Sequence, residues 1–396
     1  MNKDLTLSVS RRELVGLAKE LISCRGLSGE EGQLVAKLKR ILTDMEFSNI
    51  AVDQFGNITA VIPGQDSELS PLLFDCHLDT VGVNDKEKWE SDPFIASERN
   101  HRIYGRGASD MRGALAALIY ALKAISRNKL KRDIVISGSV GEEVQEGMAF
   151  APVLDNHQPN LVIICESTGG KLNIGQRGRA ELKLQVRGES AHTSSPEVGC
   201  NAVTGMLKWI EQIANLEPPR DKNLGAGIMV LTDIISKPYP GLSVLPEECL
   251  VTYDRRLVGE ETADSLLTDI KEQITADMKA YDWEFSLELA QAQLTTYTGQ
   301  KITAAKFAPA WYFSPQEKFV VAASQAFKKA GLENSLGTYS FCTNGSMSAG
   351  RHNIPTLGYG PGLEERAHTT NEYVEIAELE TAAKGYYALA KVLADN

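Results

Sequence analysis

Short apolar runs that alternate with helix-patterned segments are the feature that most constrains the fold of this chain. Buried-strand patterns occur at 58–62, 72–78, 134–140 and 161–166. Segment 30–45 precedes the first of them, and segment 111–125 lies between the second and the third; both carry apolar residues at helical spacing. Strands that alternate with helices form parallel sheets covered on both sides, so we expect an α/β domain with a mostly parallel sheet and helices on both faces. Ser10-x-x-Glu13 and Ser28-x-x-Glu31 are typical of capping boxes, and we expect a helix to begin at each.

The pattern changes after about residue 176. Segment 179–190 alternates apolar and polar residues, and a helix, two strands, a second helix (261–281) and a strand follow it. The order βαββαβ is that of a ferredoxin-like unit. We therefore predict an inserted α+β domain at 177–295 and a catalytic domain formed by 1–176 and 296–396.

Composition excludes several classes of protein. The net charge of −11 and pI near 5.2 argue against a nucleic-acid partner, which would require a basic face. Six scattered cysteines without a C-x-x-C pair indicate free thiols and a reducing compartment. The N-terminal sequence has no apolar region of a secretory signal, and no run approaches membrane-spanning length. A cytoplasmic protein is expected.

Metal-ligand residues follow several of the predicted strands. The carboxyl ends of strands in an open α/β sheet gather at one edge, so residues distant in sequence can meet there. Each residue alone has a simpler explanation: Asp110 could cap a helix, and Glu142–Glu143 could be a solvated acidic pair. Together, two histidines and several carboxylates suffice to hold two divalent metals and indicate hydrolysis. The candidates are His77, Asp110, Glu142 or Glu143, Glu166 and His368.

Several motifs in fixed order carry a resemblance to a known superfamily. They are HLDTV, W-x-x-DPF, YGRGASDMRGALAAL, GEEVQEG, CES, GESAHTSSPEVGCNA and GYGPG-x(4)-AHTTNEYV, and they span nearly the whole chain. The sequence resembles the di-zinc amidohydrolases and exopeptidases that include acetylornithine deacetylase, succinyl-diaminopimelate desuccinylase, aminoacylase and glutamate carboxypeptidase. In that superfamily the inserted domain is a lid and forms a homodimer.

The resemblance implies a role for each matching residue. His77, Asp110 and Glu166 would hold one Zn²⁺, and Asp110 would bridge to a second, for which Co²⁺ or Mn²⁺ could substitute. The second ion would also be held by Glu143 and His368. Glu142 would be the general base, Asp79 would orient His77, and His192 would reach the partner subunit's site to stabilise the oxyanion. The substrate would contact Arg256, Asn344 and Gly345, although Ser243-x-x-Pro246 and the stretch 340–350 depart from the common pattern.

These residues predict a hydrolase that cleaves the amide bond of an N-acyl amino acid or short peptide with a free carboxylate. The expected nucleophile is a hydroxide held by two zinc ions. A dipeptidase or carboxypeptidase is the alternative within the superfamily, and a non-catalytic metal-binding protein is the alternative outside it. Zinc phosphoesterase chemistry would require cations near the site, and the motif loops offer Arg106, Arg112 and Arg366.

Overall fold

The chain forms two compact units in the computed structural model, which describes residues 5–125, 130–275 and 283–395. The first unit comprises Met1–Gln176, Gln293–Ala304 and Tyr312–Asn396, and the second comprises Arg177–Ala292 and Ala305–Trp311. The boundaries differ slightly from the predicted ones. Residues 293–295, predicted in the inserted domain, belong to the first unit, and residues 305–311, predicted in the catalytic domain, belong to the second. Within the described ranges, no helix combines the length and the apolar character needed to cross a membrane.

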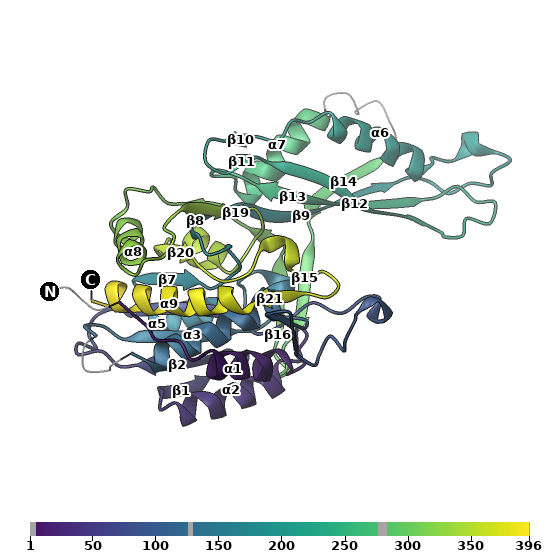
Figure 1. The fold of residues 1–396 in the computed structure, drawn as a ribbon. Helices are drawn as coiled ribbons and strands as arrows, with labels where there is room; N and C mark the ends of the chain where they lie inside the picture. Colours follow the sequence, from purple (N-terminus) through teal and green to yellow (C-terminus); the bar gives the residue numbers. More distant parts are fainter. Residues whose placement is uncertain (1–4, 126–129, 276–282, 396) are drawn as a thin grey trace. The chain divides into compact units, whose positions relative to one another are not determined.

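The first unit is built on a nine-stranded sheet (Figure 1). Its strand order is β1-β2-β6-β3-β7-β20-β8-β18, with β19 paired to β8. The central strands β6, β3, β7 and β20 run parallel. Strands β1 and β2 pair antiparallel with their neighbours, and β8 pairs antiparallel with β20 but parallel with β19. This arrangement confirms the predicted α/β fold with a mostly parallel sheet. The strands are β1 (Ser48–Val52), β2 (Ile58–Ile62), β3 (Leu72–His77), β6 (Ile134–Ser139), β7 (Leu161–Ile164), β8 (Leu172–Gln176), β18 (Trp311–Tyr312), β19 (Leu336–Tyr339) and β20 (Thr356–Gly358).

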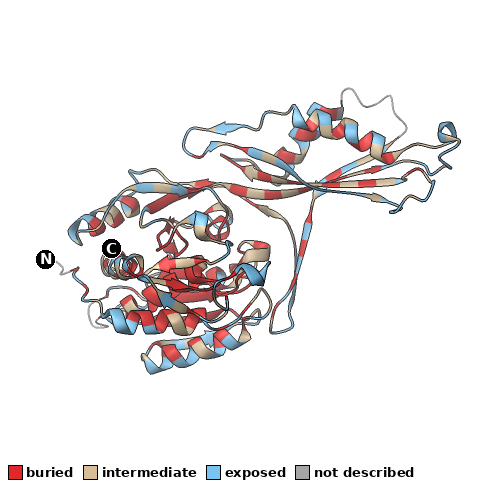
Figure 2. Ribbon diagram, turned by 45° about the vertical axis from the view of Figure 1, so that its right-hand side comes forward, coloured by how far each residue is buried: buried red, intermediate tan, exposed pale blue. Residues whose placement is uncertain are grey.

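Alternating side chains of these strands build two hydrophobic layers, one on each face of the sheet. Leu72, Phe74 and Cys76 of β3 pack into the larger layer, whereas Leu73 packs into the smaller one. Period-2 alternation explains the division, and Figure 2 shows the central strands buried along their length. Helices α1 (Arg11–Ile22), α2 (Gly32–Asp44), α3 (Gly113–Lys123), α8 (Lys318–Lys329) and α9 (Ile376–Leu393) contribute to the larger layer, and α5 (Ala151–His157) and the π-helix η5 (Ser346–Arg351) to the smaller.

Two small sheets of the first unit were not predicted. One contains β4 (Ser97–Arg99), β5 (Arg102–Tyr104) and β21 (Tyr373–Glu375), and the other is a hairpin of β15 (Gln291–Thr295) and β16 (Lys301–Ala305). The remaining short elements are η1 (Lys86–Lys88), the π-helix η2 (Ala108–Arg112), α4 (Glu142–Gln145) and η6 (Glu364–Arg366).

Neither predicted capping box forms. Helix α1 does begin after Ser10, but the Ser10 side chain makes no cap hydrogen bond. Helix α2 begins after Glu31, again without a side-chain cap, so the Ser28-x-x-Glu31 pattern has another explanation, given below.

The second unit is ferredoxin-like, as predicted. Strands β9 (Gly178–Arg187), β12 (Ile228–Lys237), β13 (Glu248–Leu257) and β14 (Glu284–Leu289) form an antiparallel sheet in the order β12-β13-β9-β14. Helices α6 (Ala202–Ala214) and α7 (Ala263–Thr275) pack on one face, and the predicted end of α7, at 276–281, lies outside the described residues. Short elements complete the unit: η4 (Pro196–Val198), β10 (Arg220–Asp221), β11 (Gly225–Ala226) and β17 (Phe307–Ala308).

Candidate metal centre

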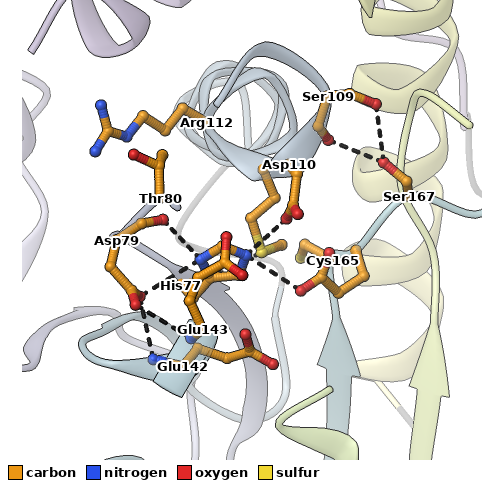
Figure 3. A network of polar contacts seen from close by, with 12 residues as sticks. His77, Asp79, Thr80, Ser109, Asp110, Arg112, Glu142, Glu143, Cys165 and Ser167 are labelled. Atoms are coloured by element: carbon orange, nitrogen blue, oxygen red, sulfur yellow. Dashed lines mark hydrogen bonds and ion pairs between the residues drawn. The ribbon is translucent and has the colours of Figure 1, made fainter. Parts of the chain in front are cut away.

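His77 is the last residue of β3, and its ring is almost fully buried. Its Nδ1 lies 3.0 Å from the backbone oxygen of Asp79, and because a carbonyl only accepts, Nδ1 must donate. In the neutral ring the lone pair is therefore on Nε2. That atom lies 2.8 Å from Asp110 Oδ1 (Figure 3). It also lies 3.3 Å from Glu166 Oε1. A buried imidazole nitrogen that faces two carboxylates is arranged as a metal ligand.

Asp110 connects two clusters of potential ligands. Its Oδ1 faces His77, and its Oδ2 lies 3.1 Å from His368 Nε2. The backbone breaks from helical geometry at Asp110 (φ −124°, ψ 91°), and the Asp110–Met111 peptide bond is cis. Asp110 therefore does not cap α3, which begins three residues later, at Gly113. A carboxylate with one oxygen directed to each cluster is suited to bridge two ions.

The ligand atoms form two groups, and within each group all atoms lie within 4.8 Å of one another. One group is His77, Asp110 and Glu166, and the other is Asp110, Glu143 and His368. Glu143 Oε2 lies 3.0 Å from His368 Nε2. The His77 side chain is 1% exposed but that of His368 is 52% exposed, so the second group is the one open to solvent.

Asp79 does more than the sequence predicted. Its Oδ1 lies 3.6 Å from His77 Nδ1, farther than its own backbone oxygen. The carboxylate instead accepts the backbone N–H groups of Glu142 and Glu143, both at 3.1 Å, and the hydroxyl of Ser28 at 2.7 Å. Asp79 thus orients His77 chiefly through its main chain and holds the first turn of α4 through its side chain (Figure 3).

The electrostatics of these groups indicate a cluster with too few cations. Burial raises the pKa of Glu166 to about 7, and the Asp110 charge adds to the effect. Burial also raises the pKa of Glu143 and, well above its usual range, that of Glu142. Among the described residues, the ion pairs that reach Asp110, Glu143 and Glu166 come only from His77 and His368.

Glu142 has the surroundings of a proton acceptor. The residue is 7% exposed, and its buried Oε1 has no hydrogen-bond partner in the structure. It lies next to Glu143, a potential metal ligand, in the first turn of α4, and its backbone is held by Asp79. A buried carboxylate oxygen without a partner is costly, so its retention suggests a chemical task.

The three arginines of the motif loops are held by other contacts. Arg106 Nη1 pairs with the buried Glu372 at 2.7 Å, and Arg366 pairs with Glu378 at 2.7 Å. Arg112 is 1% exposed and donates to the backbone oxygens of Cys24, Gly26 and Leu78. Their guanidinium groups are committed to the fold, which does not favour the phosphoesterase alternative.

The predicted substrate residues of the first unit have structural contacts. Asn344 is 3% exposed, and its amide nitrogen donates to Asp75 Oδ2 at 2.8 Å and to Ser139 Oγ at 2.9 Å. The backbone N–H of Gly345 donates to Thr343 Oγ1. Both residues form part of the layer beneath the strand ends, and contact with a substrate stays a prediction.

His192 and Arg256 lie in the second unit. The backbone N–H of Ser194 donates to His192 Nδ1 at 3.1 Å, so in the neutral ring Nε2 carries the proton and can donate. Arg256 Nε pairs with Asp254 Oδ1 at 2.9 Å, so its charge is already partly compensated.

Three further residues were not identified as part of the site. Ser28 contacts Asp79, Glu31 contacts the turn before Glu142, and Glu372 Oε1 accepts the backbone N–H groups of Ser109 and Asp110. The Ser28-x-x-Glu31 pattern was visible but indicated a helix start. Glu372 follows His368 by four residues, a spacing that could have drawn attention to it.

The fold and this cluster together define a metal-dependent hydrolase. A family model described as Peptidase family M20/M25/M40 matches residues 73–392, and the chain belongs to this family. The uncharacterized protein YgeY of Escherichia coli (strain K12) is 29% identical over 95% of this chain and 93% of its own length. Succinyl-diaminopimelate desuccinylase of Thioalkalivibrio sulfidiphilus is 25% identical over 96% and 99%, respectively. The crystal structure of aminopeptidase PepT from Bacillus cereus has the same fold, with a TM-score of 0.76 and 21% identity over 98% and 99% of the two chains.

Proposed function

We propose that the protein hydrolyses the amide bond of an N-acyl amino acid or short peptide and uses two zinc ions. The observation that carries this proposal is the pair of ligand groups joined by Asp110. Each group supplies one imidazole and two carboxylates, which suit Zn²⁺. The buried carboxylates need cations, and no Lys or Arg in the described part of the chain forms an ion pair with them. When bound, the ions supply Lewis acidity that polarises a carbonyl and lowers the pKa of water.

Glu142 is the general base of the proposed reaction. Its carboxylate accepts a proton from water as the water oxygen bonds to the amide carbon, and then donates that proton to the leaving nitrogen. Burial raises the pKa of Glu142, which makes the ionised form a better proton acceptor. The backbone bonds to Asp79 hold the base next to Glu143, so the proton acceptor and a ligand share one rigid turn.

The substrate class follows from the amide chemistry of the family and from the basic residues of the second unit. The desuccinylase and the aminopeptidase above are both named for amide-bond cleavage. Arg256 would bind the substrate carboxylate, which would replace Asp254 as its ion-pair partner. Dipeptides are the second substrate class to test, because the site residues do not distinguish an acyl group from an aminoacyl group.

We further propose that the second unit forms a homodimer through β12, the edge strand of its sheet. Exposed apolar side chains follow this strand at an edge that other strands can extend. They are Ile228, Val230, Leu231, Ile234 and Ile235. In the dimer, His192 of one subunit would donate from Nε2 to the oxyanion formed in its partner's site.

The decisive experiment combines metal analysis with substrate turnover. Protein reconstituted with Zn²⁺, Co²⁺ or Mn²⁺ should bind two ions per chain and hydrolyse members of a panel of N-acyl amino acids and dipeptides. Glu142→Gln should keep both ions and lose about 10²–10⁴-fold in kcat. The exposed Glu365→Gln variant serves as the charge-matched control. Full turnover by metal-loaded Glu142→Gln would refute the assignment, and two bound ions without any turnover would favour the non-catalytic alternative.

The dimer is tested by mixing inactive variants. Glu142→Gln and His192→Ala should each be inactive alone, and their mixture should regain activity because one composite site is intact in the mixed dimer. Ile234→Lys should shift the protein toward monomers in analytical ultracentrifugation. A dimer of unchanged stability, or a mixture as inactive as its components, would contradict the proposed interface or the shared site.

A further inference from the structure

Glu31 is fully buried, yet its side chain makes no cap hydrogen bond to α2, the helix that it precedes. Its Oε1 accepts the backbone N–H groups of Gly29 at 3.0 Å and of Gly141 at 3.1 Å. Its Oε2 is buried without a hydrogen-bond partner in the structure. Burying a carboxylate that leaves one oxygen unpaired is unfavourable for stability. The side chain is therefore retained for what Oε1 holds rather than for its own burial.

Gly141 is the residue whose conformation determines how α4 begins. Its φ of +68° is in the left-handed region that favours glycine, and Glu142 follows directly. A Cβ at Gly141 would lie 2.2 Å from a methyl carbon of Leu294, so the turn is also closed from outside. The peptide between Gly141 and Glu142 therefore has little freedom once its neighbouring N–H groups are bound.

Two buried carboxylates bind three successive backbone N–H groups at this turn. Glu31 accepts from Gly141, and Asp79 accepts from Glu142 and Glu143. The loop that carries Glu31 also provides Ser28, whose hydroxyl donates to Asp79. Three directional hydrogen bonds, each of 3.1 Å, fix these successive peptide groups, so they set the direction in which the side chains of α4 leave the backbone.

The loop itself is anchored from the other side. Gly29 has a φ of +86°, and a Cβ there would lie 2.6 Å from the backbone oxygen of Thr295, in the β15–β16 hairpin. Leu294 of the same hairpin packs on Gly141. The loop around Glu31 is thus held between the hairpin and the turn, and it cannot follow a movement of Gly141 without breaking these contacts.

From this geometry we propose that Glu31 is a positioning residue for the reaction, which acts through the Gly141 N–H to aim the carboxylate of Glu142. The inference rests on the proposed role of Glu142 as general base. It explains why Ser28-x-x-Glu31 resembles a capping box without forming one. Neither side chain caps α2. Glu31 instead binds the Gly141 N–H at the start of α4, and Ser28 binds Asp79, which holds the same turn.

The first test compares substitutions that keep or remove the acceptor at Glu31. Glu31→Ala should lower kcat about 10–100-fold with KM and bound metal unchanged, as expected for loss of a residue that supports site residues. Glu31→Gln should recover most of kcat, because its side-chain oxygen can accept both N–H groups. Glu30→Gln is the matched control: it changes the adjacent, exposed glutamate, which faces Arg25 at 3.6 Å. Wild-type kcat in Glu31→Ala would overturn the proposal.

A double-mutant cycle distinguishes action through Glu142 from a general structural effect. In a Glu142→Gln background, Glu31→Ala should cause no further loss of kcat, because the group that it positions is absent. The same 10–100-fold loss in both backgrounds would overturn the proposal. If Glu31→Ala does not fold, Glu31→Asp takes its place, since it keeps the charge and withdraws the acceptor by one methylene.

Hydrogen exchange gives a measurement that does not depend on turnover. The Gly141 amide should exchange at least about 10-fold faster in Glu31→Ala than in Glu30→Gln, while the amides of β3 and β6 stay unchanged. Unchanged exchange at Gly141 would overturn the proposal even if kcat falls. Faster exchange in a protein that hydrolyses no amide would instead refute the proposed function and, with it, the catalytic role of Glu31. Only the hydrogen bond between Glu31 and the Gly141 N–H would then be confirmed.

Discussion

Removal of the metal ions should make the stability of this protein fall as pH rises, and Glu166 should account for much of the effect. Burial and the charge of Asp110 raise the pKa of Glu166 from 4.5 to about 7. A carboxyl group whose pKa is raised in the folded state stabilises the fold fully below its unfolded pKa. That contribution is lost as pH rises through the folded pKa. The metal-free protein should therefore lose stability between about pH 4.5 and pH 7, where Glu166 ionises without a metal ion.

The structure gives the size of this effect in two ways. The shift of the Glu166 pKa corresponds to about 3 kcal/mol, at about 1.4 kcal/mol for each pKa unit. Two carboxylates whose ligand atoms lie within 4.8 Å of one another repel by about 3 kcal/mol in an effective dielectric of about 20. Burial is the larger cause of the shift and the repulsion from Asp110 the second, whereas the pairing with His77 lowers the pKa of Glu166. Bound Zn²⁺ would cancel the shift, since the carboxylate is then a ligand in its ionised form.

Urea unfolding measures this effect directly. The free energy of unfolding is determined at pH 5, 6, 7 and 8 for chelated and metal-loaded protein, for the wild type and for Glu166→Gln. The chelated wild type should lose about 2–3 kcal/mol more than chelated Glu166→Gln over this range, because glutamine does not titrate. Chelation should destabilise the wild type more at pH 8 than at pH 5. Equal pH dependence of the two chelated proteins would refute the argument that Glu166 is a carboxylate in need of a cation.

Three other substitutions test the contacts that support the site. Glu372→Ala leaves Arg106 buried without its ion-pair partner and should lower the free energy of unfolding, measured with urea, by about 3–5 kcal/mol. The same substitution removes the acceptor of the Asp110 N–H and should weaken metal retention, measured by dialysis. Gly141→Ala places a Cβ against Leu294 in a left-handed conformation, and should cost at least about 1–2 kcal/mol and lower kcat, whereas Gly299→Ala, with open space around it, should cost only the backbone strain. Arg112→Lys cannot reproduce a planar fork that binds the Cys24, Gly26 and Leu78 oxygens, so the melting temperature should fall by several degrees and a neutral result would contradict that role.

The sequence was informative where a pattern reflects the sheet. The short apolar runs at 72–77 and 134–139 predicted buried parallel strands, and the residues at the ends of the predicted strands gave most of the cluster, because parallel strands end at one edge. Asp110 was harder to predict, since aspartate before a helix is usually a cap. Its place in the cluster depends on a backbone break inside η2 that no residue pattern announces.

The sequence was misleading where a local rule competes with a distant contact. Ser28-x-x-Glu31 satisfies the capping-box pattern, yet its side chains bind Asp79 and Gly141, which are more than fifty and a hundred residues away along the chain, respectively. A helix cap contributes about 1 kcal/mol, so two tertiary hydrogen bonds outweigh it. Asn344 also makes a distant contact, because its amide nitrogen donates to Asp75, and its contact with a substrate stays a prediction.

The points where the chain leaves and re-enters each unit are neighbours within that unit. In the first unit, β8 ends at Gln176 beside β18, and the N–H of Phe313 donates to Ile174 at 2.8 Å. In the second, β17 pairs with the start of β9, Phe307 opposite Ala180. Because the two ends of segment 177–311 lie close together in each unit, the segment has the geometry of an insertion that can be removed or replaced. A short turn could close the gap in the first unit, and another ferredoxin-like module could be grafted there, although the hairpin at 293–304 would have to be supplied separately.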